Sequence, residues 1–376
     1  MRLHVLALLL LPALLTAQKP PAWQMQNSGT TASLRGIYSV DGATAWASGT
    51  GGTVLKTIDG GQNWQRCATP DAGTDGATLD FRGVQAWDAD TAIVMASGPG
   101  DKSRLYKTTD GCKTWRLLFK NPDQDGFWDS LRFFKEQRSL KTDEGFGLLL
   151  GDPVAGEITV YETRDGGRSW TRLHDPVLRA KGSAFAASNS CIASINATND
   201  FILGGESGSA KLRLNYSGTY WRNDRSKFVR DWTKVSVPID SSSASKGSFA
   251  IGTHVQILHA PSGAAGMNLK LFEVIVGGDY EHPERTEGTA AYSLDSGEHW
   301  AAAQKPPHGY RSTVQWDEQE KLWIAAGSNG SDVSRDDGRT WQKLDDGNWN
   351  ALSLPFLVGP GGRIARLNAA ALEEAR

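Results

Sequence analysis

The sequence is poor in the residues that disulfide scaffolds and metal sites need. It contains only three cysteines, Cys67, Cys112 and Cys191, so at most one disulfide can form and a disulfide-dense scaffold is excluded. We expect the cysteines to be small buried side chains, although the pattern leaves open whether two of them pair. The 7 histidines lack zinc-like spacing, and the chain has no phosphate-binding loop and no dinucleotide fingerprint. We therefore expect no metal and no cofactor.

A strong charge of one sign is also missing. The chain has 40 basic and 42 acidic residues, which is a formal net charge of −2. This balance does not indicate a surface that binds a polyanion. We therefore expect no nucleic-acid partner. At 39% hydrophobic and 22% charged residues, the composition is that of a folded globular protein, which we expect to be a monomer.

Long hydrophobic runs are missing after the N-terminus. The apolar run from Val5 to Leu15 is too short to span a bilayer, and it lies between Arg2 and the small residue Ala17, which is the pattern of a secretory signal peptide over residues 1–17. No cysteine follows the expected cut, so a lipoprotein is not indicated. The mature chain should be exported to the periplasm or outside the cell without a membrane span. We expect one domain over residues 18–368 and a C-terminal tail over 369–376.

Glycine and tryptophan, in contrast, are abundant. The 42 glycines and 14 tryptophans favour a turn-rich β protein, and the pattern S/T-x-D-x-G-x-x-W occurs five times, with Cys112 in place of the glycine once. In such a turn the carboxylate accepts backbone N–H groups, glycine permits a positive φ, and the tryptophan opens the next strand. The motif residues are Asp59, Trp64, Asp110, Trp115, Asp165, Trp170, Asp295, Trp300, Asp336 and Trp341.

The spacing of these turns predicts the fold. Successive motif aspartates lie 51, 55, 130 and 41 residues apart, so the long interval should hold one degenerate unit, closed by Trp232. Each turn joins two strands, and two more strands precede it, which gives four strands per unit. Units of about 50 residues are typical of propeller blades. We predict an all-β, seven-bladed β-propeller of four-stranded antiparallel blades, closed by an N-terminal strand over Trp23 to Gln26.

The five turns resemble the Asp-box (BNR) motif of sialidase-like propellers. The longer stretch from Leu34 through Gly49 to Trp64 is similar to blades of the photosystem II assembly and stability factor family and its bacterial relatives. The resemblance covers about Leu34 to Trp341. It implies a non-enzymatic propeller that binds a protein partner through an arginine-rich patch, with the Asp boxes as structural turns.

The innermost strands place a candidate binding face around the channel mouth. Arg35, Arg82 and Arg311 occupy matched positions at the start of their blades, and Arg132 lies near the corresponding point of the third blade. Guanidinium groups can bind carboxylates of a protein, or an acidic or glycan ligand, in a bidentate manner. Loops expected on the same face contribute Asp152, Glu206, Asp279 and Tyr280. We assign no catalytic residue.

Two alternatives remain. A glycoside hydrolase of the sialidase-like or xyloglucanase-like type would use the three matched arginines as a triad, Tyr280 with Glu281 as the nucleophilic pair and Asp129 as the acid. The sequence departs from the sialidase pattern, because Arg35-Gly36-Ile37 stands where Arg-Ile-Pro is usual, and blade duplication alone explains the repeated arginines. In the second alternative, the arginines only pair with acidic neighbours in the channel wall.

Overall fold

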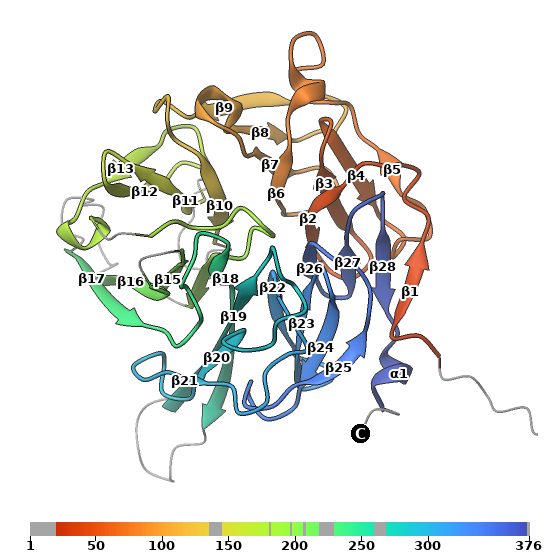
Figure 1. Ribbon diagram of the computed structural model, residues 1–376. Coiled ribbons are helices and arrows are strands. Elements are labelled where there is room, and N and C mark those ends of the chain that lie inside the picture. Colours follow the sequence, from red (N-terminus) through yellow and green to blue (C-terminus); the bar gives the residue numbers. More distant parts are fainter. Residues whose placement is uncertain are drawn as a thin grey trace, which may run out of the picture.

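The computed structural model describes residues 20–134, 145–179, 182–195, 198–205, 208–217, 229–258 and 268–373. Seven four-stranded antiparallel sheets stand side by side around a central axis (Figure 1), so the predicted seven-bladed propeller is confirmed. The expected signal peptide, residues 1–17, lies outside the described residues.

In each of the first six blades, the four strands follow one another in chain order from the central axis to the outer edge. Blade 1 holds β2 (Leu34–Ser39), β3 (Ala45–Gly49), β4 (Thr53–Thr57) and β5 (Gln65–Arg66), and blade 2 holds β6 (Phe81–Ala86), β7 (Ala92–Ala96), β8 (Arg104–Thr108) and β9 (Arg116–Lys120). Blade 3 holds β10 (Trp128–Phe133), β11 (Gly147–Val154), β12 (Glu157–Thr163) and β13 (Thr171–Leu173), and blade 4 holds β14 (Ile192–Ile195), β15 (Thr198–Leu203), β16 (Ala210–Ser217) and β17 (Val229–Ser236). Blade 5 holds β18 (Lys246–Leu258), β19 (Asn268–Asp279), β20 (Ala290–Ser293) and β21 (Ala301–Ala302), and blade 6 holds β22 (Thr313–Asp317), β23 (Leu322–Gly327), β24 (Gly330–Ser334) and β25 (Gln342–Asp345).

The seventh blade is assembled from both ends of the chain. It holds β26 (Ala351–Ser353), β27 (Phe356–Val358), β28 (Ile364–Leu367) and, as its outermost strand, β1 (Trp23–Gln26). β1 pairs antiparallel with β28, so that Trp23 lies opposite Leu367 and Gln26 opposite Ile364. The predicted closure by the N-terminal strand is therefore confirmed, and it couples the two ends of the ring.

The five repeated turns share one hydrogen-bond scheme. In the first, the Thr57 hydroxyl donates to Asp59 Oδ1 at 2.8 Å and accepts from the Gly61 N–H at 3.0 Å. Asp59 Oδ1 also accepts the Asn63 N–H at 3.0 Å, which closes the turn. In the second turn Cys112 takes the glycine position with φ 69° and donates its N–H to Thr108 Oγ1. The degenerate unit of blade 4 has Trp232 in β17. Its turn was expected within residues 220–231, of which 220–228 lie outside the described residues.

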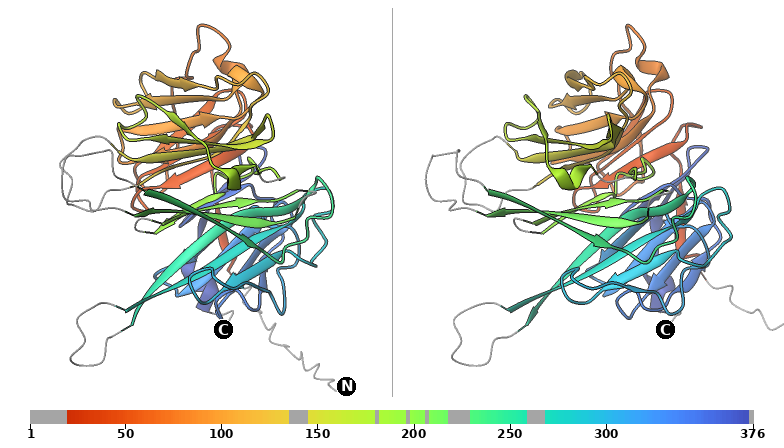
Figure 2. Two further views of the ribbon diagram at one scale, coloured as in Figure 1. Left: turned by 90° about the vertical axis from the view of Figure 1, so that its left-hand side faces the viewer. Right: turned by 60° about the vertical axis from the view of Figure 1, so that its left-hand side comes forward.

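Small helices and long hairpins complete the chain. Three 3₁₀ turns cover Gly76–Thr78, Gly100–Lys102 and Pro176–Leu178, and the tail forms α1 (Ala369–Glu373), with Ala371 and Leu372 buried against blades 6 and 7. The strands β18 and β19 are the longest of the described strands and carry blade 5 well beyond the ring (Figure 2). Within the described residues, no helix is long and apolar enough to cross a bilayer.

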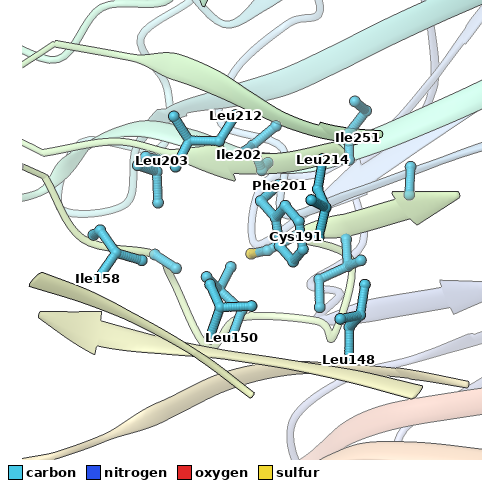
Figure 3. Close-up of a cluster of buried hydrophobic side chains, with 14 of the residues drawn as sticks. Leu148, Leu150, Ile158, Cys191, Phe201, Ile202, Leu203, Leu212, Leu214 and Ile251 are labelled. Carbon is cyan, nitrogen blue, oxygen red and sulfur yellow. The ribbon is translucent and has the colours of Figure 1, made fainter. Parts of the chain in front are cut away.

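Apolar side chains fill the space between neighbouring sheets. The largest cluster joins blades 3, 4 and 5, and Figure 3 shows Cys191 within it beside Leu150, Phe201 and Leu214. This free thiol behaves as the small buried side chain that we expected.

The other two cysteines are buried as well, and they answer the question of pairing that the sequence left open. Cys67, directly after β5, and Cys112, in the turn between β8 and β9, form a disulfide with their Cα atoms 5.3 Å apart. Sequence spacing could not show this bridge, because the two residues meet only when the sheets of blades 1 and 2 pack against each other. The disulfide ties the outer parts of these two blades together.

Candidate binding face at the channel mouth

In four blades, a β-bulge at the start of the innermost strand determines which side chain points to the channel mouth. In β2 the register shifts between Leu34 and Gly36, so Arg35 has no partner residue in β3. β6, β10 and β18 shift their registers in the same way. A bulge re-aims the extra side chain. The residues at these four bulges are Arg35, Arg82, Asp129 and Phe249.

Arg35 and Arg82 lie together over a single carboxylate. Arg82 Nε is 2.8 Å from Asp80 Oδ2, and Arg35 Nε is 3.8 Å from Asp80 Oδ1. Burial lowers the pKa of Arg35, and the positive charge of Arg82 lowers it further against the opposing effect of Asp80. Arg35 Nε is buried and has no hydrogen-bond partner among the described residues, although 31% of the side chain is exposed. Two guanidinium groups therefore compete for one carboxylate and retain unused donor capacity.

The other two predicted arginines are not part of this pair. The backbone N–H of Arg311 donates to Gly277 O in the preceding blade, just as the backbone N–H of Leu34 donates to Gly359 O. Arg311 therefore corresponds to Leu34 of blade 1 and not to Arg35. Its side chain is fully buried, and its guanidinium donates to Asp332 at 2.7 Å and Asn329 at 3.3 Å. The match from sequence was thus wrong by one residue, which in a strand reverses the direction of the side chain.

Arg132 is exposed but lies three residues after the Asp129 bulge, opposite Leu148 near the start of β11. The residue of blade 3 that corresponds to Arg35 is Asp129. Arg132 therefore belongs to the other end of its strand.

A segment between blades 3 and 4 crosses the mouth, which the sequence reasoning missed. Residues 182–190, here called the crossing segment, reach the centre of the ring from the left in Figure 1. Arg82 Nη1 donates to Ala186 O at 3.2 Å, and Asn189 Oδ1 accepts the Leu131 N–H at 2.7 Å. Ser188 Oγ donates to Ser312 O in blade 6 at 2.6 Å. The segment therefore contacts blades on opposite sides of the axis.

The sequence signals of this segment are its length and its composition. The stretch from Leu173 to Ile192 is long for a blade connection, and it is rich in alanine and serine without the alternation of a strand.

Aromatic rings form the part of the mouth beside the crossing segment. Phe185 stacks on Phe249 with ring centroids 3.9 Å apart, and Tyr310 meets Phe249 edge-on at 4.8 Å. Tyr280 lies 6.1 Å from Phe249 and is 47% exposed. Tyr310 also lies near Arg35, so the aromatic group adjoins the arginine pair. The predicted Tyr280 thus lies on a ring cluster that the sequence did not reveal.

The predicted carboxylates have different surroundings. Burial alone would raise the pKa of Asp279, but hydrogen bonds from Ser245 and from the backbone of Glu281 and His282 outweigh it and lower the pKa. Asp279 also accepts from Arg285 Nη1 at 3.4 Å. Burial raises the pKa of Asp152 to about 6. Glu206 lies outside the described residues.

The residues considered for a glycosidase do not form its site. Asp129 is 1% exposed and lies beneath the crossing segment, and Arg311 is fully buried on Asp332. Among the residues that the structure describes, one group could hold a metal ion by proximity, namely Asp295, Glu298 and His299. His299 there bonds to Asp295 as part of the fourth repeated turn.

The comparisons with known proteins agree with this architecture. No family model matches the chain. Over 253 residues, which are 60% of this chain and 68% of the relative, the sequence is 24% identical to the photosystem II assembly lipoprotein Ycf48 of Synechococcus sp. (strain CC9902).

Two solved structures share the fold over most of their length. A structure of YCF48 bound to D1 peptide matches with a TM-score of 0.56 and 16% identity, covering 93% of this chain and 98% of that one. YCF48 from Cyanidioschyzon merolae matches with a TM-score of 0.52 and 18% identity, covering 93% and 99%. Both likenesses concern the propeller fold.

Proposed function

We propose that this protein is an exported, non-enzymatic propeller that binds a protein partner at the channel mouth, as an assembly factor does. The observation that carries the proposal is the arginine pair: Arg35 and Arg82 share Asp80, and 31% of the Arg35 side chain is exposed. A carboxylate of a partner would relieve the repulsion between the two guanidinium groups by pairing with the exposed part of Arg35.

The neighbouring rings support a peptide segment as the ligand. Tyr280 presents nearly half of its surface beside Phe249 and Phe185, so an apolar side chain could pack there while a carboxylate meets the arginines. The similarity to Ycf48, and to a solved structure described as bound to D1 peptide, supports the same class of ligand. The chain would act as a monomer, without cofactor, metal or nucleic acid.

The test compares charge reversal at the mouth with charge reversal elsewhere. Tagged mature protein, residues 18–376, is used to capture exported proteins of the source organism, which are identified by mass spectrometry. We expect Arg35→Glu and Arg82→Glu to lose the partner at least tenfold, the usual cost of about 1.4 kcal/mol or more for a charge-assisted hydrogen bond.

The matched control is Arg132→Glu, because Arg132 is an exposed arginine on an innermost strand but at its other end. Circular dichroism melting establishes that each variant is folded. Equal capture by the wild type and the two mouth variants would overturn the proposal, and so would equal loss in the Arg132 variant.

A further inference from the structure

A cleft on the rim opposite the channel mouth gathers positive charge. It lies between the repeated turns of blades 2 and 3, and its volume is about 360 Å³. These turns follow the third strand of each blade, and successive strands alternate in direction, so the turns lie at the blade end away from the mouth. The cleft, here called the cationic cleft, is lined by Lys107, Thr109, Thr114, Trp115, Arg116 and Arg168.

Two of these positive charges stand opposite each other on neighbouring strands. Lys107 in β8 and Arg116 in β9 are direct register partners. The side chains of such partners are close neighbours, and like charges placed there destabilise a sheet. Burial and the positive charges of Arg116 and Arg168 lower the pKa of Lys107, and no acidic group among the described residues counteracts them. The chain therefore contains a contact that costs stability in the free protein.

The equivalent lysine of blade 1 has a different environment. Lys56, like Lys107, directly precedes the threonine that begins a repeated turn, and both ammonium groups lie over a tryptophan ring. Lys56 Nζ donates to Ala89 O at 3.0 Å and to Gly111 O at 3.2 Å, both in blade 2. Its register partner in β5 is the neutral Gln65. Lys56 thus ties blade 1 to blade 2 and faces no like charge.

Lys107 does not make the equivalent bonds to blade 3. Gly111 of the second turn corresponds to Gly166 of the third. The position that a Cβ would take at Gly111 is 2.9 Å from Lys56 Nζ, but at Gly166 this position is 3.9 Å from the lysine nitrogen of blade 2. Among the residues that the structure describes, Lys107 has no hydrogen-bond acceptor and no carboxylate partner, and its contact is the Trp87 ring at 5.5 Å. Its N–H donors therefore remain available in the cleft.

The carboxylate of the second turn does not neutralise the cleft. Asp110 accepts from the Thr108 hydroxyl at 2.8 Å, from the Thr114 hydroxyl at 2.6 Å and from two backbone N–H groups of the turn. Both of its oxygens are thus used within the turn. The charges of Lys107 and Arg116 are left for a ligand.

We propose that the cationic cleft binds a tetrahedral dianion, namely a phosphate or sulfate group. Lys107 supplies a point charge and Arg116 a planar fork of N–H donors, which are the two kinds of group that bind phosphate in proteins. The dianion neutralises both cations and removes their repulsion. A free anion and a monoester both present this group. The Trp115 ring, held by a hydrogen bond from its Nε1 to Ala68 O at 2.8 Å, gives the organic part of an ester a surface to pack on.

The experiment is calorimetric titration of the mature protein with sodium phosphate, sodium sulfate and phenyl phosphate at neutral pH. The ionic strength is held constant, because salt screens exposed charges. We expect the wild type to bind phosphate and sulfate saturably. Lys107→Met and Arg116→Gln should each weaken binding at least about tenfold, the effect of losing a charge-assisted hydrogen bond. Tighter binding of phenyl phosphate than of phosphate assigns the site to a monoester, and equal or weaker binding assigns it to the free anion.

The matched control is Lys113→Met, which removes an exposed lysine of the same turn that does not line the cleft. Its affinity should stay within about twofold of the wild type. Thermal melting without polyvalent anions adds a second readout. Arg116→Gln, which gives blade 2 the glutamine of blade 1, should melt no lower than the wild type, because a like-charge contact is removed. Lys56→Met should melt lower, because two hydrogen bonds to carbonyl groups are lost.

Three results would overturn the proposal. The first is the absence of saturable phosphate or sulfate binding by the wild type, which is decisive even if no variant folds. The second is an equal affinity of the wild type, Lys107→Met and Arg116→Gln, or an equal loss in Lys113→Met. The third is binding that is lost in Arg35→Glu and kept in Lys107→Met, because the anion would then lie at the mouth. None of these results depends on partner capture, so the proposed function is tested separately.

Discussion

Replacing Trp23 by alanine tests whether the N-terminal strand closes the ring. Trp23 is 4% exposed, its ring lies 6.2 Å from that of Trp349, and its Nε1–H donates to Ser331 Oγ in blade 6 at 2.9 Å. A buried tryptophan removes about 150–250 Å² from water, worth about 4–6 kcal/mol at about 25 cal/mol per Å². Incomplete collapse of the cavity and the lost hydrogen bond act in the same direction.

We therefore expect Trp23→Ala to reduce the free energy of unfolding by at least about 4 kcal/mol, measured by urea denaturation followed through far-UV circular dichroism. The control is Met25→Ala on the same strand. Met25 is 56% exposed, so its replacement should change the free energy by less than about 0.5 kcal/mol. A Trp23→Ala variant within about 1 kcal/mol of the wild type would show that β1 does not carry the closure of blade 7.

Two further predictions concern the turns and the disulfide. Asp336→Ala should destabilise the fold by about 1–2 kcal/mol, because Asp336 accepts from the Ser334 hydroxyl at 2.9 Å and the Thr340 N–H at 2.8 Å, and an unchanged melting temperature would contradict this role. Burial alone would raise the pKa of Asp336, but these bonds and the Thr340 hydroxyl lower it, so its contribution is present above the unfolded value of about 3.9 and is lost as the pH falls below it. Reduction of the Cys67–Cys112 disulfide, which closes a loop of 45 residues, should lower the free energy of unfolding by about 4 kcal/mol. The measurement compares denaturation with and without dithiothreitol. A difference below about 1 kcal/mol would show that blades 1 and 2 hold together without the disulfide.

The repeat made the fold predictable. A turn that needs an aspartate, a residue tolerant of positive φ and a following tryptophan is a local requirement, so it is visible in the chain without knowledge of distant contacts. Its recurrence at blade spacing, together with an unpaired strand at each end, then leaves a closed ring as the arrangement without free sheet edges. Trp232 could be placed in blade 4 by the same spacing, even without its turn.

The face at the channel mouth could be predicted only in part. Arg35 and Arg82 follow the repeat, because the repeat preserves the bulge that directs them. Arg311 breaks the rule, since one residue of offset before β22 turns its side chain inward to Asp332. Such an offset depends on the strand register of blade 6, which the residue types around it do not reveal.

By itself, then, the sequence determined the blade unit, the number of blades and the strand that closes the ring, because each depends on local turn chemistry and on counting. The tertiary structure alone decided the disulfide and the crossing segment. These features arise where residues from different blades meet at the axis or at a blade edge. Contacts of that kind depend on packing and register, which leave no periodic trace in the chain.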